Sequence, residues 1–152
     1  MLRTRFQDQL KQSIHAKDEI AVSTLRLIIA AMKDRDIAAR GKGNWEGISD
    51  DDILAMLQSM IKQRHESIKM YEVGNRPELA AREASEIRII ETFLPAQLSE
   101  DEVKAAIEDA VTGVSATGIK DMGKVIGALK SKYTGQMDFS KVSLLVKERL
   151  TN

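Results

Sequence analysis

Apolar residues recur every three or four positions along most of the chain, which is the spacing of one face of an α-helix. Seven such stripes follow one another, separated by polar or glycine-containing stretches. The first four are Leu2, Phe6, Leu10 and Ile14; Leu25, Ile28, Ile29 and Met32; Ile53, Leu57, Met60, Ile61, Arg64, Ile68 and Tyr71; and Leu79, Ala80, Ile87, Ile90 and Leu94. The last three are Val103, Ile107 and Val111; Met122, Val125, Ile126, Leu129 and Tyr133; and Phe139, Val142, Leu145, Val146 and Leu150. Because the chain holds only two prolines, this pattern predicts an all-α protein of seven helices.

Residues that cap helices mark several of the predicted boundaries. Asp18 is expected to cap the second helix, and Ser49 to cap the third. Gly74 is expected to end the third helix, and Pro77 suits the first turn of the fourth. The seventh helix is expected to run from about Asp138 to the end of the last stripe.

A domain boundary is predicted at the sequence Leu94-Pro95-Ala96-Gln97-Leu98-Ser99. Pro95 disfavours helical geometry in the residue before it, and Ser99 followed by Glu102 forms a capping box that starts a new helix. We therefore expect an N-terminal helical bundle of four helices over residues 1–94, a linker over 95–98, and a small C-terminal three-helix unit over 99–152.

The composition excludes several classes of protein. The 152 residues are 43% hydrophobic and 30% charged, which is typical of a globular chain, and there is no cysteine for a disulfide or a thiolate metal site. No apolar run approaches the ~18 residues that cross a membrane, and the N-terminal sequence MLRTRFQDQLK lacks the apolar core of a leader peptide. We expect a cytoplasmic protein without a membrane partner.

Charge is balanced overall but is distributed unevenly. Lys plus Arg and Asp plus Glu are both 23. Residues 99–111 carry five acidic residues and one lysine, whereas residues 120–152 carry seven basic residues and three acidic ones. Any surface that meets a polyanion is therefore expected in the C-terminal part of the chain.

The segment GIKDMGKVIGALKSKY, residues 118–133, has the glycine and lysine spacing of a phosphate-binding loop. That loop needs Ser or Thr after the lysine to hold magnesium, but Val125 follows Lys124 here. The preceding residues are also polar, whereas such a loop follows a buried strand. We therefore predict no nucleotide site, no metal and no cofactor.

Read as a helix, the same segment places two glycines four residues apart beside its apolar stripe. Each glycine costs roughly 0.5–1 kcal/mol relative to alanine in a helix, so Gly123 and Gly127 suggest that something approaches the backbone closely. One possibility is a neighbouring helix of the same bundle. The other is a phosphodiester backbone, for which Lys120, Lys124 and Lys130 would supply positive charge.

The remaining candidates for chemistry favour structural roles. His15 and His65 are too isolated in sequence to predict a metal site. Glu83 and Glu86 are three residues apart beside an apolar stripe and could meet Arg64 across a pair of helices. We predict an ion pair there rather than a pair of catalytic carboxylates, and no catalytic residue is predicted anywhere in the chain.

Three segments together resemble the GatB/YqeY family, and in particular its free-standing YqeY-like proteins. They are MIKQRHESIKMYEVGNRPELAAREASEIRIIETFLPAQLSEDEV, GIKDMGKVIGALK and DFSKVSLLVKERL, and the likeness extends over essentially the whole chain. The resemblance implies an all-helical fold in two parts. It also implies a relationship to the tail of the B subunit of the tRNA-dependent amidotransferase, a tail that resembles a tRNA-holding module.

By this resemblance the chain is a tRNA-binding or accessory protein whose partners are tRNA and amidotransferase subunits. The family-level activity is that of a carbon–nitrogen ligase with glutamine as the amido donor, although the residues alone show no self-contained active site. The expected nucleic-acid contacts are Lys120, Gly123, Lys124, Gly127 and Lys130. Two alternatives remain open: a ligase subunit active only in a larger complex, and a protein-interaction scaffold without RNA contact.

Overall fold

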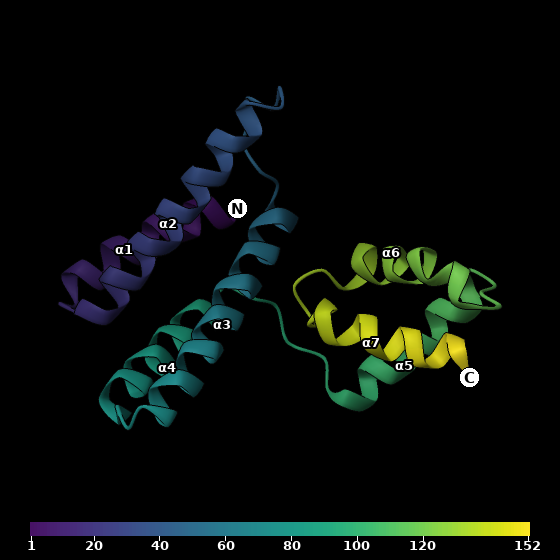
Figure 1. Ribbon diagram of the computed structural model, residues 1–152. Helices are drawn as coiled ribbons and strands as arrows, with labels where there is room; N and C mark the ends of the chain where they lie inside the picture. Colours follow the sequence, from purple (N-terminus) through teal and green to yellow (C-terminus); the bar gives the residue numbers. More distant parts are fainter. The chain divides into compact units, whose positions relative to one another are not determined.

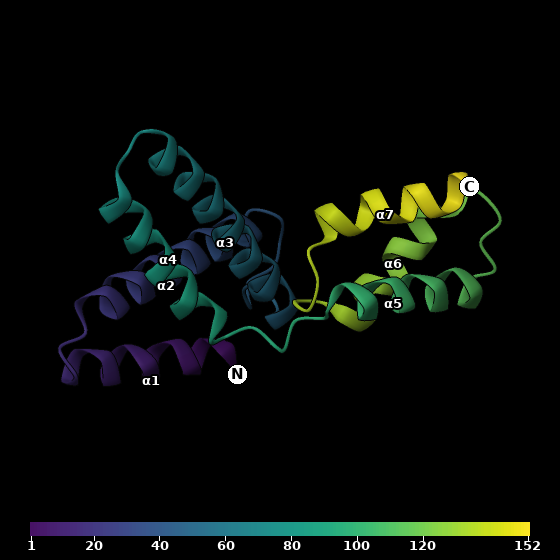
Figure 2. The same cartoon turned by 90° about the horizontal axis from the view of Figure 1, so that it is seen from below.

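The computed structural model describes residues 1–152 and contains seven α-helices and no strand (Figures 1 and 2). The predicted all-α fold is confirmed. The chain divides into two compact units, Met1–Leu94 and Pro95–Asn152, with four helices in the first and three in the second. No helix combines the length and the apolar character needed to span a bilayer.

The N-terminal unit is built from α1 (Leu2–His15), α2 (Glu19–Arg40), α3 (Asp50–Val73) and α4 (Pro77–Glu91). In both views α1 lies alongside α2, and α3 lies alongside α4. Helix α2 also packs against α3 and α4, so it joins the two helical pairs.

The core of this unit follows the predicted stripes, apart from Met56 and Phe93, which lie outside them. Its buried side chains are Leu2, Phe6, Leu25, Ile28, Ile29, Met32, Ile53, Met56, Leu57, Met60, Ile90 and Phe93. The rings of Phe6 and Phe93 meet edge to face with centroids 4.9 Å apart, an arrangement that adds to the energy of burial. Ile14, at the end of the first predicted stripe, is instead 49% exposed.

The capping residues start the helices where the sequence predicts. The side chain of Asp18 accepts a hydrogen bond from the Ala21 backbone N–H at 3.1 Å, and that of Ser49 accepts one from Asp52 at 3.2 Å. At the end of α3, Gly74 keeps an ordinary negative φ, and Asn75 adopts the left-handed conformation (φ 55°) that reverses the chain. Asparagine tolerates this conformation better than most residues, so the turn does not need the glycine for it.

The loop between α2 and α3 is fixed by a polar node at Arg3 and Asp36. The Arg3 guanidinium donates to both carboxylate oxygens of Asp36, at 2.7 and 2.8 Å, and to the Ile48 carbonyl at 2.9 Å. Asp36 in turn accepts from the Ile48 N–H at 2.9 Å. Chiefly because of the Arg3 hydrogen bond, the pKa of Asp36 falls to about 2.

The C-terminal unit is built from α5 (Glu100–Gly113), a short 3₁₀ turn η1 (Ile119–Asp121), α6 (Met122–Tyr133) and α7 (Phe139–Thr151). Helix α6 packs against both α5 and α7. The buried core side chains are Ala106, Ile107, Val111, Val125, Leu129, Met137, Val142 and Val146, as the stripes predict apart from Ala106 and Met137.

Residues of the predicted linker make hydrogen bonds within this unit. The Gln97 side chain donates to the Gly135 carbonyl at 2.6 Å, and the Leu98 N–H donates to the Gln136 carbonyl at 2.9 Å. Ser99 then caps α5 by accepting from the Glu102 N–H at 3.2 Å. The chain entering α5 is therefore attached to the turn between α6 and α7.

Candidate nucleic-acid interface

The two glycines of α6 are exposed and uncovered. A methyl group added at Gly123 or Gly127 would meet no atom within 4 Å beyond the adjacent backbone of its own helix. No neighbouring helix of the bundle therefore approaches this flank, which argues against the first of the two explanations for the glycines. The buried side of α6 is formed instead by Val125 and Leu129.

The glycine flank and its lysines lie on one side of α6. At about 100° per residue, Gly123, Gly127 and Lys130 fall within an arc of roughly 60°, and Lys124 lies about 60° outside it, still on the solvent side of the helix. All four residues are exposed. We call this surface, together with Lys120 on the preceding turn, the α6 glycine–lysine face. It presents bare backbone beside several ammonium groups.

The three lysines of this face differ in their surroundings. The Lys124 ammonium lies 4.0 Å from a carboxylate oxygen of Asp121, and its side chain is 72% exposed. The Lys130 ammonium lies 5.9 Å from the centroid of the Phe139 ring, a cation–π contact with the start of α7. Lys120 is exposed on η1 and makes no ion pair. Because of its contact with Phe139, the Lys130 ammonium lies near the start of α7.

Asp121 organises the turn that leads into α6. Its carboxylate accepts a hydrogen bond from the Thr117 N–H at 2.9 Å, and its own N–H donates to the Gly118 carbonyl at 3.0 Å. The Thr117 hydrogen bond is the main reason that the pKa of Asp121 lies below its ordinary value. Although Asp121 occupies the N-cap position of α6, its side chain makes no capping hydrogen bond to that helix. The carboxylate therefore holds the turn and offsets part of the positive charge of the face.

Glu86 forms the ion pair that the sequence predicts with Arg64. The Arg64 Nε lies 3.1 Å from Glu86 Oε2, and the two side chains are only 12% and 10% exposed. Arg82 approaches the other oxygen of Glu86 at 3.6 Å. Burial, followed by the charge of Glu86, raises the pKa of the nearby Glu83 carboxyl. This cluster has the geometry of a structural ion pair between α3 and α4.

Metal ligands do not cluster in the chain. The structure contains no group of three or more His, Cys, Asp or Glu side chains placed to hold a metal ion. All buried side-chain nitrogen and oxygen atoms have hydrogen-bond partners.

The sequence did not reveal a hollow in the N-terminal unit between the end of α1, α2 and α4. Leu27, on α2, is 50% exposed and lines it together with Ile14. In the sequence the only signal is that Leu27 lies outside the stripe that α2 buries, which by itself is common for a surface leucine.

Comparison with known proteins identifies the family. The model of the Yqey-like protein family matches residues 3–150. The mitochondrial "Altered inheritance of mitochondria protein 41" of Lachancea thermotolerans is 35% identical over 145 residues, which cover 90% of this chain and 75% of that protein. The chain therefore belongs to the YqeY-like family.

Proteins of the same name from two further yeasts match a shorter stretch. The Vanderwaltozyma polyspora protein is 31% identical and the Saccharomyces cerevisiae S288c protein 33% identical, each over 85 residues. These matches cover 56% of this chain and 44% of each yeast protein.

These names correct the expected cytoplasmic location. The relatives are named as mitochondrial proteins, which points to mitochondria rather than to the cytoplasm. The expectation rested on the absence of cysteine and of an N-terminal apolar segment. Neither feature distinguishes the cytoplasm from other compartments that lack disulfide formation.

Proposed function

We propose that this YqeY-like protein is an RNA-binding accessory protein, and that its α6 glycine–lysine face contacts the backbone of a structured RNA of the tRNA class. The observation that carries the proposal is that Gly123 and Gly127 are exposed with no neighbouring atom within 4 Å. Glycine weakens a helix, and here no internal packing compensates for that cost. An external backbone that must come close to α6 provides a reason for both glycines.

Charge and shape favour a phosphate backbone over base recognition. Lys120, Lys124 and Lys130 lie at or beside the glycines, and lysine ammonium groups bind phosphates as point charges. The chain has 4% aromatic residues, so it offers few rings on which unpaired bases could stack. Binding is therefore expected to depend on RNA shape and on salt concentration, with little dependence on sequence.

The link to amidation is the second part of the proposal. As a relative of an amidotransferase tail, the protein would hold tRNA for a carbon–nitrogen ligase whose catalytic groups lie on other subunits. A reconstituted amidation assay with glutamine as the donor tests this part. Removal of the chain should slow amidation of tRNA-bound glutamate or aspartate, and an unchanged rate would contradict it.

The direct test is tRNA binding by the full chain in a series of salt concentrations. The variant with Lys124→Glu and Lys130→Glu should lose affinity, and the slope of log K against log salt should fall in magnitude by about 1–2. Lys132→Glu is the matched control for each of the two single substitutions, because it changes the charge by the same amount and Lys132 is exposed on the same helix but on the opposite side from the glycines.

An equal loss of tRNA affinity in Lys132→Glu and in the single variants Lys124→Glu and Lys130→Glu would indicate non-specific attraction and contradict the assigned face. If Gly127→Leu removes a protein partner and leaves tRNA affinity unchanged, the scaffold alternative is correct.

A further inference from the structure

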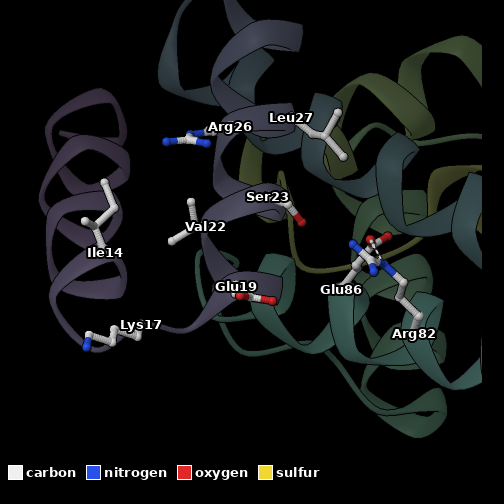
Figure 3. A pocket seen from close by; sticks show the side chains of 9 residues that line it. All are labelled: Ile14, Lys17, Glu19, Val22, Ser23, Arg26, Leu27, Arg82 and Glu86. Atoms are coloured by element: carbon white, nitrogen blue, oxygen red, sulfur yellow. Dashed lines mark ion pairs between the residues drawn. The ribbon is translucent and has the colours of Figure 1, made fainter.

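A second surface lies in the N-terminal unit, whereas the residues assigned to RNA belong to the C-terminal unit. The end of α1, the first half of α2 and the middle of α4 line a hollow of about 790 Å³ (Figure 3). Ile14 contributes from α1, Val22 and Leu27 from α2, and Arg82 and Glu86 from α4. We call this hollow the α1–α2–α4 groove.

The floor of the groove is apolar and open to solvent. Ile14 and Leu27 are 49% and 50% exposed, and Val22 is half-buried. The position of Ile14 is informative because the rest of its stripe, from Leu2 to Leu10, turns towards the core. Figure 3 shows Ile14 and Leu27 at opposite sides of the hollow, with Val22 between them. Exposed apolar side chains that line one hollow with a polar surround are typical of a surface that binds another protein.

The groove also carries a surplus of positive charge. Lys17, Arg26 and Arg82 line it, and neither Lys17 nor Arg26 makes an ion pair within the chain. Of the two lining carboxylates, Glu86 is already bound by the buried Arg64 and approached by Arg82, which leaves Glu19 as the one without an ion pair. The groove therefore has three basic side chains around its apolar residues, and Glu19 is the one lining carboxylate that is not already in an ion pair.

We infer that the α1–α2–α4 groove binds an amphipathic helix of a partner protein whose apolar residues are flanked by Asp or Glu. Such a helix presents side chains at positions i, i+3, i+4 and i+7 to an apolar groove. Its acidic flanks complement Lys17, Arg26 and Arg82, and a rim of charge around an apolar centre is the usual anatomy of a protein interface.

Other occupants fit less well. The volume lies in the range of small-ligand pockets, roughly 300–1,000 Å³, but such pockets enclose most of their ligand. Here the apolar side chains are half exposed, so the hollow is shallow. A phosphate backbone would use the cations and leave Ile14 and Leu27 uncovered, whereas an acidic amphipathic helix uses both.

Glu86, which lines the groove, belongs to the buried ion pair with Arg64. Glu86 is held by Arg64 at 3.1 Å and in turn pairs with the Arg82 Nε at 3.6 Å, so Arg82 has a fixed partner while its side chain remains 57% exposed. An arginine oriented in advance loses less entropy when it binds a carboxylate.

The test uses two synthetic helical peptides of about 15 residues with the same leucines at helical spacing and either Glu or Lys on the flanks. With the full chain, the Glu peptide should bind at least tenfold more tightly than the Lys peptide. Arg26→Glu combined with Arg82→Glu should abolish this preference, and Leu27→Ser should weaken the Glu peptide about tenfold. The control combination Arg35→Glu with Arg88→Glu changes the same charges on α2 and α4 outside the groove and should bind as the unaltered chain does.

Equal binding of the two peptides, or no effect of Leu27→Ser in a chain that melts normally, overturns the inference. A photo-crosslinking residue at position 27 in cells identifies the natural occupant, with position 37 on the same helix as the exposed control. Crosslinks from position 27 to an acidic helical segment of another protein support the inference. Crosslinks to RNA, lipid or a second copy, or none beyond the control, contradict it. Because these residues lie outside the α6 glycine–lysine face, either proposal can fail without the other.

Discussion

The Arg64 guanidinium and the Glu86 carboxylate face each other across α3 and α4 at 3.1 Å, with both side chains nearly removed from solvent. Arg64 also donates to the Met60 carbonyl at 3.2 Å, so its charge is satisfied on two sides. Removing Arg64 leaves the Glu86 carboxylate buried with only the more distant Arg82, at 3.6 Å and 57% exposed, to offset its charge, which is costly.

Arg64→Met should therefore lower the free energy of unfolding by about 3–5 kcal/mol, measured by chemical denaturation. Replacing both partners, with Arg64→Met and Glu86→Leu, should restore most of this loss because no charge is then buried. Arg76 and Glu78 form a control pair at 2.7 Å whose side chains are 59% and 60% exposed. Arg76→Ala should lower the free energy of unfolding by less than about 1 kcal/mol. If Arg76→Ala and Arg64→Met lowered it equally, burial of the Arg64–Glu86 pair would not explain the effect.

Stability should also depend on the ionisation of Asp36. Its pKa in the folded chain is about 2, below the ordinary value near 3.8, so folding favours the charged form. The stabilisation is complete above about pH 4 and is lost as the pH falls towards 2. It amounts to at most about 2 kcal/mol, because Arg3 is 35% exposed and solvent screens part of the interaction.

Asp36→Asn should accordingly be less stable than the unaltered chain at pH 7 and similar to it at pH 2. Urea denaturation at intervals between pH 2 and 7 measures the difference. A difference that stays constant over this range would show that the charge of Asp36 does not contribute.

Opposite effects on stability and RNA affinity are expected at Gly127. Because a methyl group meets no atom there, Gly127→Ala should stabilise α6 by about 0.5–1 kcal/mol. The same methyl group should weaken tRNA binding if a phosphate backbone lies against the helix. Thermal melting and a tRNA titration on the same sample measure both effects. Unchanged affinity in the more stable variant would contradict close contact with RNA at this residue.

Gly47 should respond in the opposite way. Its φ is +95°, and a Cβ there would lie 2.7 Å from both Arg3 Nη2 and Asp36 Oδ1. Gly47→Ala should therefore destabilise the chain by more than about 1 kcal/mol, through backbone strain and displacement of the ion pair. Gly43→Ala serves as the comparison, since its φ is +89° and it has no neighbouring atom within 4 Å. A similar loss at both positions would mean that strain alone accounts for the effect at Gly47.

The sequence predicted those parts of the fold that depend on local interactions. Helix starts at Asp18, Ser49 and Ser99 were correct because a cap needs only the next three residues. The pairing of Arg64 with Glu86 could also be predicted, because both lie beside the buried stripes of consecutive helices.

Interactions between distant parts of the chain could not be predicted in this way. Arg3 is separated from Asp36 by 33 positions and from Ile48 by 45, and no periodic pattern relates them. The exposure of Ile14 was missed for the same reason, since it depends on how α2 and α4 pass the end of α1. For Gly123 and Gly127, the sequence left a packing helix and an external backbone as alternatives. Only the packing of the three C-terminal helices showed that this flank is uncovered.

The attachment of Gln97 and Leu98 to the turn at Gly135 and Gln136 determines where the chain can be divided. A recombinant fragment that begins at Pro95 retains both hydrogen bonds, whereas one that begins at Ser99 leaves two backbone carbonyls without these donors. Residues 95–152 are therefore the segment to isolate for testing the proposed RNA contact apart from the N-terminal unit, or to transplant onto another protein.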